Sequence, residues 1–242
     1  MPTEQFEIPK QADDVSCGPT ALYAVYRHYG IDVTLEQVNK DVERMPNQGT
    51  IDAYLGIDAL KRGMYATIVS SNISVLDPTW NHLGGDDLVV KLEAFRDAMN
   101  KSGRYTEATV ADAYARFVRM GGVLRVATSI PSLSACIVRI PNGFMTGKFD
   151  ENLPAICGIS YTALFNAVRE DDDTNEETDL GRPVGHFVVV TRKPNWDFYD
   201  VADPWDGPRG QHYSLSNDEL DRAILLGTLT NDGGILIVKP RG

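Results

Sequence analysis

The sequence predicts an α+β fold, with a helical front half packed on an antiparallel β-sheet formed by the back half. Apolar residues recur at helical spacing up to about residue 121. Beyond that point, short apolar or β-branched runs stand between turn residues, which is typical of strands. The chain has 242 residues, of which 43% are hydrophobic and 24% are charged. This length and composition fit one globular domain spanning 1–242, with a helical insertion or lobe at about 87–121.

The first predicted helix covers residues 18–29 and begins directly after Cys17. Its apolar side chains follow the spacing i, i+3, i+4 and i+7, which places them on one face. Pro19 suits the first helical turn, and Gly30 is a typical stop. A second predicted helix opens with a capping box at 34–37. Further predicted helices cover 51–62, share 87–121 with a break near 101–103, and open at 216–219.

Short apolar runs predict the strands. Turn residues at Pro194 and Asn195 separate two of these runs, which predicts a β-hairpin. The predicted strands are residues 65–69, 154–159, 186–192, 198–202 and 235–238.

The net charge of −11 makes nucleic acid and anionic membrane surfaces poor partners. The first ten residues lack the basic and apolar regions of a signal peptide, and no apolar run has the length of a membrane span. Three widely spaced cysteines, Cys17, Cys136 and Cys157, indicate reduced thiols rather than disulfides. We therefore expect a cytoplasmic protein. Because metal-ligand spacings such as C-x-x-C are missing from the sequence, we expect no metal or other cofactor.

Cys17 is the first candidate for chemistry because it lies at the start of the first predicted helix. The N–H groups and partial positive charge of a helix N-terminus stabilise a thiolate, which is the nucleophilic form of cysteine. A small cysteine could also simply fit a tight junction at this position.

His186 is the candidate base, since it opens an apolar strand that precedes the predicted hairpin turn. An acid near the far end of the second strand could lie beside it and accept its Nδ1 proton. Asp200, Asp203 and Asp206 are all available, and strand alternation places Asp200 and Asp203 on opposite faces.

Gln11 lies six residues before Cys17 and could donate its side-chain amide to a developing oxyanion, with the Cys17 backbone N–H as the second donor. Other residues of the same types fit less well. His28 is about 16 Å from Cys17 along the same helix. His82 and His212 remain alternative bases, and Cys136 and Cys157 resemble buried core residues.

An acidic stretch at 170–181 comes just before His186 and lacks hydrophobic periodicity. It fits a solvated loop best. If it overhangs the cleft instead, it could attract basic peptide segments.

Taken in order, Gln11, the run Ser16 to Leu22, the run Gly185 to Val189, and Asp203-Pro204 resemble the bacteriocin-processing cysteine peptidases of the papain-like superfamily. The best-known members are leader-cleaving domains fused to peptide-exporting ABC transporters. The segments 8–14, 59–63 and 75–80 resemble stand-alone bacterial members without a transporter. Ser16 replaces the aspartate of many transporter-fused domains, and a Walker-type motif is missing from the sequence.

This resemblance implies a papain-like fold, a peptide or protein substrate, and a set of roles. Cys17 would be the nucleophile, His186 the base, Asp203 the orienting acid and Gln11 the oxyanion donor. The same acyl-enzyme could pass its acyl group to an amine, which would make the protein a transpeptidase. A catalytically silent peptide-binding domain and a purely structural domain are the other classes.

Overall fold

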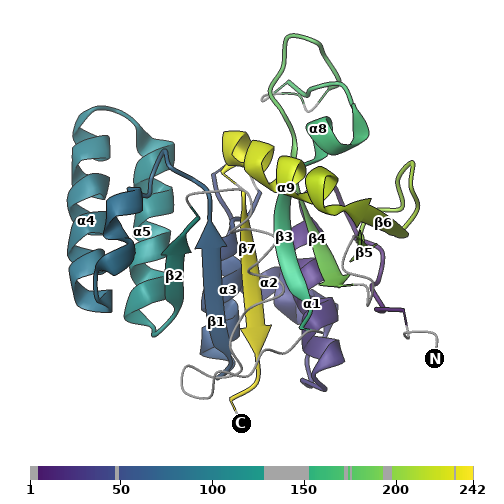
Figure 1. The fold of residues 1–242 in the computed structure, drawn as a ribbon, viewed down its shortest axis with the longest axis horizontal. Coiled ribbons are helices and arrows are strands. Elements are labelled where there is room, and N and C mark those ends of the chain that lie inside the picture. Colours follow the sequence, from purple (N-terminus) through teal and green to yellow (C-terminus); the bar gives the residue numbers. More distant parts are fainter. Residues whose placement is uncertain are drawn as a thin grey trace.

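The computed structural model describes residues 5–46, 49–127, 153–171, 174, 176–192, 198–231 and 233–241. These residues form a 7-stranded sheet with helices on both faces (Figure 1). The predicted α+β class is therefore confirmed. Cys136 and the predicted turn at Pro194 and Asn195 lie outside the described residues.

The strands lie in the order β2-β1-β7-β3-β4-β5-β6. Neighbouring strands are antiparallel except β1 and β2, which are parallel. The sheet therefore extends into the front half of the chain, beyond the back-half sheet that the sequence predicts. The strands are β1 (Tyr65–Ser70), β2 (Val123–Val126), β3 (Ala155–Ser160), β4 (Gly185–Arg192), β5 (Phe198–Ala202), β6 (His212–Ser216) and β7 (Gly234–Lys239).

The helices form separate layers (Figure 1). Helix α9 crosses one face of the sheet, whereas α1 and α3 pack on the other, and α4 and α5 lie side by side beyond β2. The helices are α1 (Cys17–His28), α2 (Leu35–Asp41), α3 (Asp52–Lys61), α4 (Gly85–Lys101), α5 (Tyr105–Arg119), α8 (Tyr161–Phe165) and α9 (Asn217–Leu226), with 3₁₀ helices η1 (Pro78–His82) and η2 (Gly227–Thr230). Within the described ranges, no helix combines the length and the apolar character needed to span a bilayer.

Local sequence signals explain where several helices begin and end. Thr34 and Gln37 form the predicted capping box of α2. Ser216 and Glu219 form another at the start of α9, where a helix was predicted to open. Gly30 follows α1 with a φ of +69°, a left-handed conformation that favours glycine and ends the helix.

Strand alternation divides the core between the two faces of the sheet. In β4, Phe187 and Val189 pack into a cluster with α1, α3, α4 and α5, whereas Val188 and Val190 pack into a cluster with α9. Because the first cluster is continuous, the α4–α5 pair shares its hydrophobic core with the helix that carries Cys17.

The first residue of α3, Asp52, carries a buried carboxyl group. Asp52 is only 2% exposed, and Tyr114 donates its hydroxyl to Oδ2 of Asp52 at 3.4 Å. Burial raises the pKa of Asp52 to about 7, although the Ala53 backbone N–H and Tyr114 oppose the shift.

We expect the Asp52→Asn variant to be more stable than the wild type at alkaline pH. The carboxyl group is more basic in the folded chain, so its favourable contribution is complete below about pH 4 and is lost as pH rises through about 7. The free energy of unfolding at about pH 8 should rise by up to about 4 kcal/mol, since one pKa unit corresponds to about 1.4 kcal/mol. Urea unfolding of the wild type and the variant at about pH 4 and about pH 8 measures this change in the free energy of unfolding. An equal change in stability at the two pH values would contradict the raised pKa assigned to Asp52.

Candidate active site

Cys17 is the first residue of α1, one residue before the predicted start of this helix, and is 9% exposed. Ser16, which precedes it, exchanges hydrogen bonds with Asp13: the Ser16 hydroxyl accepts from the Asp13 N–H at 3.2 Å and donates to the Asp13 carbonyl at 3.1 Å. The first turn of α1 carries no acidic side chain. The helix dipole therefore favours negative charge at Cys17.

Gly18 allows the start of α1 to pack closely against its surroundings. A Cβ atom at this position would lie 2.5 Å from Cγ2 of Thr50 and 3.2 Å from the Phe187 ring. A larger residue would push α1 away from β4, which carries Phe187 next to His186. The glycine after Cys17 thus keeps the cysteine helix against the histidine strand.

His186 and Asp203 form a buried pair. Nε2 of His186 lies 2.7 Å from Oδ1 of Asp203, and the two side chains are 7% and 1% exposed. The predicted hairpin is confirmed as the β4–β5 pair, but the prediction that Nδ1 meets the carboxylate is wrong. The last paired position joins Val189 to Ala202, so Asp203 lies diagonally across from His186. Such diagonal positions are about 7–8 Å apart, a span that favours the outer ring nitrogen.

The second ring nitrogen, Nδ1, is thereby left for Cys17, whose side chain is close enough to act on the charge of His186. Burial alone lowers the pKa of His186, but the hydrogen bond to Asp203 and the interaction with Cys17 more than offset it and raise that pKa to about 10. At neutral pH the site thus favours an imidazolium beside the sulfur of Cys17.

Asp203 receives two further donors. Oδ1 accepts the backbone N–H of Trp205 at 2.8 Å, and Oδ2 accepts the hydroxyl of Tyr213 at 2.9 Å. The Asp203 N–H donates to the Gln211 carbonyl at 2.8 Å, which fixes the backbone as well. Sequence reasoning missed Tyr213, because it lies in β6, a strand with polar residues at alternate positions that the pattern did not predict.

Gln11 lies beside the same segment. Its backbone N–H donates to the carbonyl of Pro204 at 2.8 Å, which brings it next to Asp203. Its side-chain nitrogen donates to the Asp13 carbonyl at 2.8 Å, so one of its two amide protons is already engaged. Its side-chain oxygen is buried without a hydrogen-bond partner.

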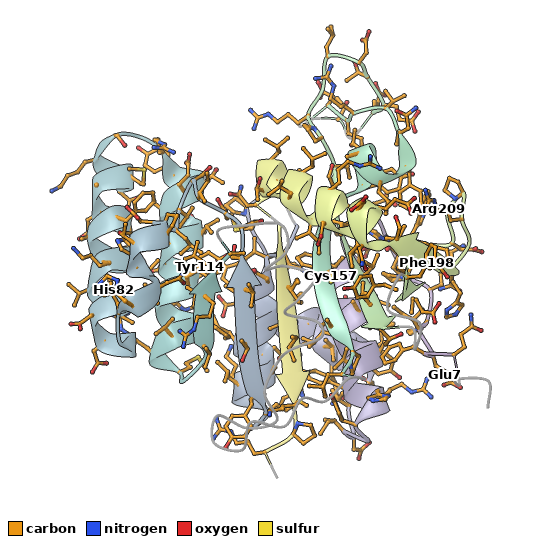
Figure 2. The ribbon with its side chains drawn as sticks, in the orientation of Figure 1. Glu7, His82, Tyr114, Cys157, Phe198 and Arg209 are labelled. Atoms are coloured by element: carbon orange, nitrogen blue, oxygen red, sulfur yellow. The ribbon has the colours of Figure 1, made fainter. Side chains whose placement is uncertain are left out.

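The other histidines lie apart from Cys17. His28 is exposed near the end of α1, where its ring centroid is 5.3 Å from that of Phe6. His82 belongs to η1, which packs on β2 at the far side of the sheet from β4 (Figure 2). His212 is the exposed first residue of β6.

Two other candidates from the sequence have separate environments. Asp200 accepts the Ser214 hydroxyl at 3.2 Å, and Asp206 is exposed. Cys157 is fully buried in the middle of β3, where burial raises the pKa of its thiol above the usual range (Figure 2). A thiol held neutral in a core is inert.

A cleft of about 590 Å³ opens at Cys17. His186 lies between two of its lining residues, Gly185 and Phe187. Its walls also include Glu170 and Asp171, so the start of the acidic stretch borders the cleft instead of projecting into solvent. The remaining walls come from residues 14–15, 45–46, 49–51, 182–184 and 229–231, and from Tyr105, Thr106 and Thr109 of α5.

Among the described residues, no group of three or more His, Cys, Asp or Glu side chains is arranged to hold a metal ion.

Two solved structures of peptidase domains are similar to this chain. One is the peptidase domain of Streptococcus ComA, a bi-functional ABC transporter involved in a quorum sensing pathway, with 13% identity, a TM-score of 0.45, and coverage of 98% of this chain and 100% of that one. The other is a double glycine motif protease from an AMS/PCAT transporter in complex with its leader peptide, with 16% identity, a TM-score of 0.44, and coverage of 100% and 97%. No family model and no curated protein sequence matches the chain.

Proposed function

We propose that this chain is a cysteine peptidase that cleaves a peptide or amide bond through Cys17, His186 and Asp203. The observation that carries the proposal is the chain of interactions from the helix-borne thiol through a buried imidazole to a buried carboxylate. The cleft lies at the Cys17 end of this chain of interactions, since Cys17 is one of its lining residues. A nucleophile, a base and an orienting acid in that order are what acyl transfer to sulfur requires.

In the proposed first step, the Cys17 proton moves to Nδ1 of His186 and the sulfur forms a bond to the carbonyl carbon. The C–N bond then breaks as the imidazolium returns that proton to the leaving amine. Water attacks the resulting thioester, its proton passes to His186, and the C–S bond breaks to release the acid. Asp203 keeps Nε2 occupied throughout, so that Nδ1 stays directed at the sulfur.

The negative oxygen of the tetrahedral intermediate needs donors near Cys17. The backbone N–H of Cys17, at the start of α1, supplies one. Gln11 supplies the second in this proposal, through the amide proton that Asp13 does not accept. Loss of such a donor typically costs about 2.7–4 kcal/mol of transition-state stabilisation.

The direct test is mass spectrometry of a randomised peptide library incubated with the wild-type protein in ¹⁸O-labelled water. A hydrolase produces new C-termini that carry one ¹⁸O atom. New peptides joined through an added amine, without the label, would show a transpeptidase instead. An unchanged library, combined with tight binding of peptides, would favour a silent binding domain.

The charge of the cleft predicts a preference among substrates. Three acidic side chains, those of Asp14, Glu170 and Asp171, line the cleft, and Arg182 is the one basic side chain among the described residues that do so. Peptides with Lys or Arg near the cleaved bond should react faster than their Asp or Glu counterparts. Glu170→Gln should reduce that preference by about threefold to tenfold at low salt.

The matched control is Asp87→Asn, which removes an equal charge from the exposed first turn of α4, away from the cleft. Steady-state kcat/KM for paired basic and acidic peptides measures both variants. An equal loss of preference in both would assign the effect to net charge rather than to the cleft.

A further inference from the structure

Tyr213 and His186 contact different oxygens of the Asp203 carboxylate. His186 lies 2.7 Å from Oδ1, whereas Tyr213 donates to Oδ2 at 2.9 Å. The Trp205 backbone N–H completes the set on Oδ1 at 2.8 Å. Because each oxygen has its own partner, the plane of the carboxylate is fixed, and the direction in which it holds the His186 ring is fixed with it.

We propose that Tyr213 is a positioning residue of this site, which acts through Asp203 to hold the His186 ring toward Cys17. The inference rests on the proposed function. Tyr213 would be a fourth residue beside Cys17, His186 and Asp203, and it touches neither the substrate nor the sulfur of Cys17.

Tyr213 remains a donor under all working conditions. Burial and then the Asp203 carboxylate raise the pKa of Tyr213 above its usual range, so the phenol keeps its proton. An ionised carboxylate can only accept hydrogen bonds. The proton between the two oxygens therefore belongs to Tyr213.

The ring of Tyr213 is held in place by its own neighbours. The Phe165 ring meets it edge-on with centroids 6.0 Å apart, and the Arg209 guanidinium lies 5.8 Å from its centroid. Arg209 is in turn paired with Glu219 of α9 at 3.4 Å. Figure 2 shows Arg209 beside β6 at this end of the sheet. A ring packed in this way presents its hydroxyl at one point, as a positioning role requires.

Other charged or titratable groups also face this region. His186 comes from β4, and Cys17 from α1 interacts with it. Tyr161 comes from α8, with its ring centroid 6.2 Å from that of His186. Arg209 faces Tyr213 from the β5–β6 connection. Within the described part of the chain, Tyr213 alone donates a hydroxyl proton to Asp203.

The sign of the effect follows from the charge that the hydrogen bond stabilises. A donor to a carboxylate favours its ionised form, so removal of the donor favours proton uptake. A protonated Asp203 no longer supports the His186 imidazolium, and the thiolate of Cys17 loses its counter-charge. Tyr213→Phe should therefore make Cys17 lose its reactivity at a higher pH than in the wild type.

The experiment is the pH profile of Cys17 alkylation by iodoacetamide, followed by mass spectrometry in the full-length chain. The acid limb of Tyr213→Phe should move up by roughly one pH unit, the scale for one hydrogen bond to a charged group. Tyr26→Phe is the matched control, because Tyr26 donates its hydroxyl to a buried carboxylate of Asp58 at 2.7 Å. That variant loses a similar bond and should keep the wild-type profile.

A double-mutant cycle separates a positioning role from a structural one. In an Asp203→Asn background, Tyr213→Phe should change the profile no further, because its effect passes through the carboxylate. If Tyr213→Phe follows the wild type while His186→Ala alters the profile, the proposed function stands and this inference is wrong. If His186→Ala leaves the profile unchanged as well, both are wrong.

Discussion

Replacement of Cys17 by alanine is expected to lower kcat/KM for peptide cleavage by at least about 10⁴-fold, the scale seen when a nucleophile of this type is removed. Without the sulfur no thioester forms, so there is no acyl-enzyme for water to hydrolyse. The fold should survive, because Cys17 is small and alanine is a good helix former. Initial-rate measurements on a cleaved peptide, with circular dichroism of both proteins, provide the test.

Cys157→Ala is the matched control for that variant. It removes a thiol that is fully buried in β3, at a position paired with Val188 rather than with His186. The cavity it leaves should lower stability, and kcat/KM should stay near the wild-type value for the folded protein. If Cys17→Ala retained activity that Cys157→Ala lost, the assignment of the nucleophile would be overturned.

Replacement of His186 by alanine is expected to have the second largest effect, about 10³-fold to 10⁴-fold on kcat/KM. The loss of the imidazole should also be detectable without substrate, in the reactivity of Cys17 toward iodoacetamide. With a His186 pKa of about 10, the imidazolium stands beside Cys17 from acid pH to well above neutrality, and its charge is lost as pH rises through about 10. Wild-type Cys17 should therefore react rapidly with iodoacetamide at about pH 6, and His186→Ala should move that reactivity to pH values near those of a free thiol, about 8.5.

His82→Ala controls for the loss of an imidazole, since His82 lies in η1 on the far side of the sheet. Its alkylation profile should match the wild type. The proposed Cys17–His186 pair would be contradicted if the pH profile of Cys17 alkylation were the same in the wild type, His186→Ala and His82→Ala. Resistance of Cys17 to alkylation in all three proteins would contradict it as well. Either result would favour the silent binding domain.

Local patterns predicted the elements that carry the site. The 198–202 strand was predicted with the bounds of β5, and the capping box predicted at 34–37 forms at the start of α2. These features depend on neighbouring residues, which a sequence displays directly. Two strands were missed for physical reasons. β2 has four residues after a glycine pair, and β6 is a mostly exposed edge strand whose alternation contains a single buried leucine.

The finer geometry of the site depends on distances between strands, which no local pattern contains. The choice of Nε2 over Nδ1 follows from the diagonal placement of Asp203 relative to His186. Tyr213 reaches Asp203 only because β6 pairs with β5, with Tyr213 opposite Val201. The sequence thus predicted which residues were candidates, whereas the structure shows which of their atoms meet.

The position of β7 has a consequence for how the chain folds. This strand lies between β1 and β3, so it joins the β1–β2 pair to the β3–β6 group. Until it is inserted, β1 and β3 each present an open edge of unpaired backbone groups, the kind of surface on which chains aggregate. Contacts between residues so far apart in sequence also slow folding. Since β7 leaves the ribosome after every strand that it connects, completion of the sheet is expected after these strands have been synthesised, during an interval in which chaperones would protect the chain.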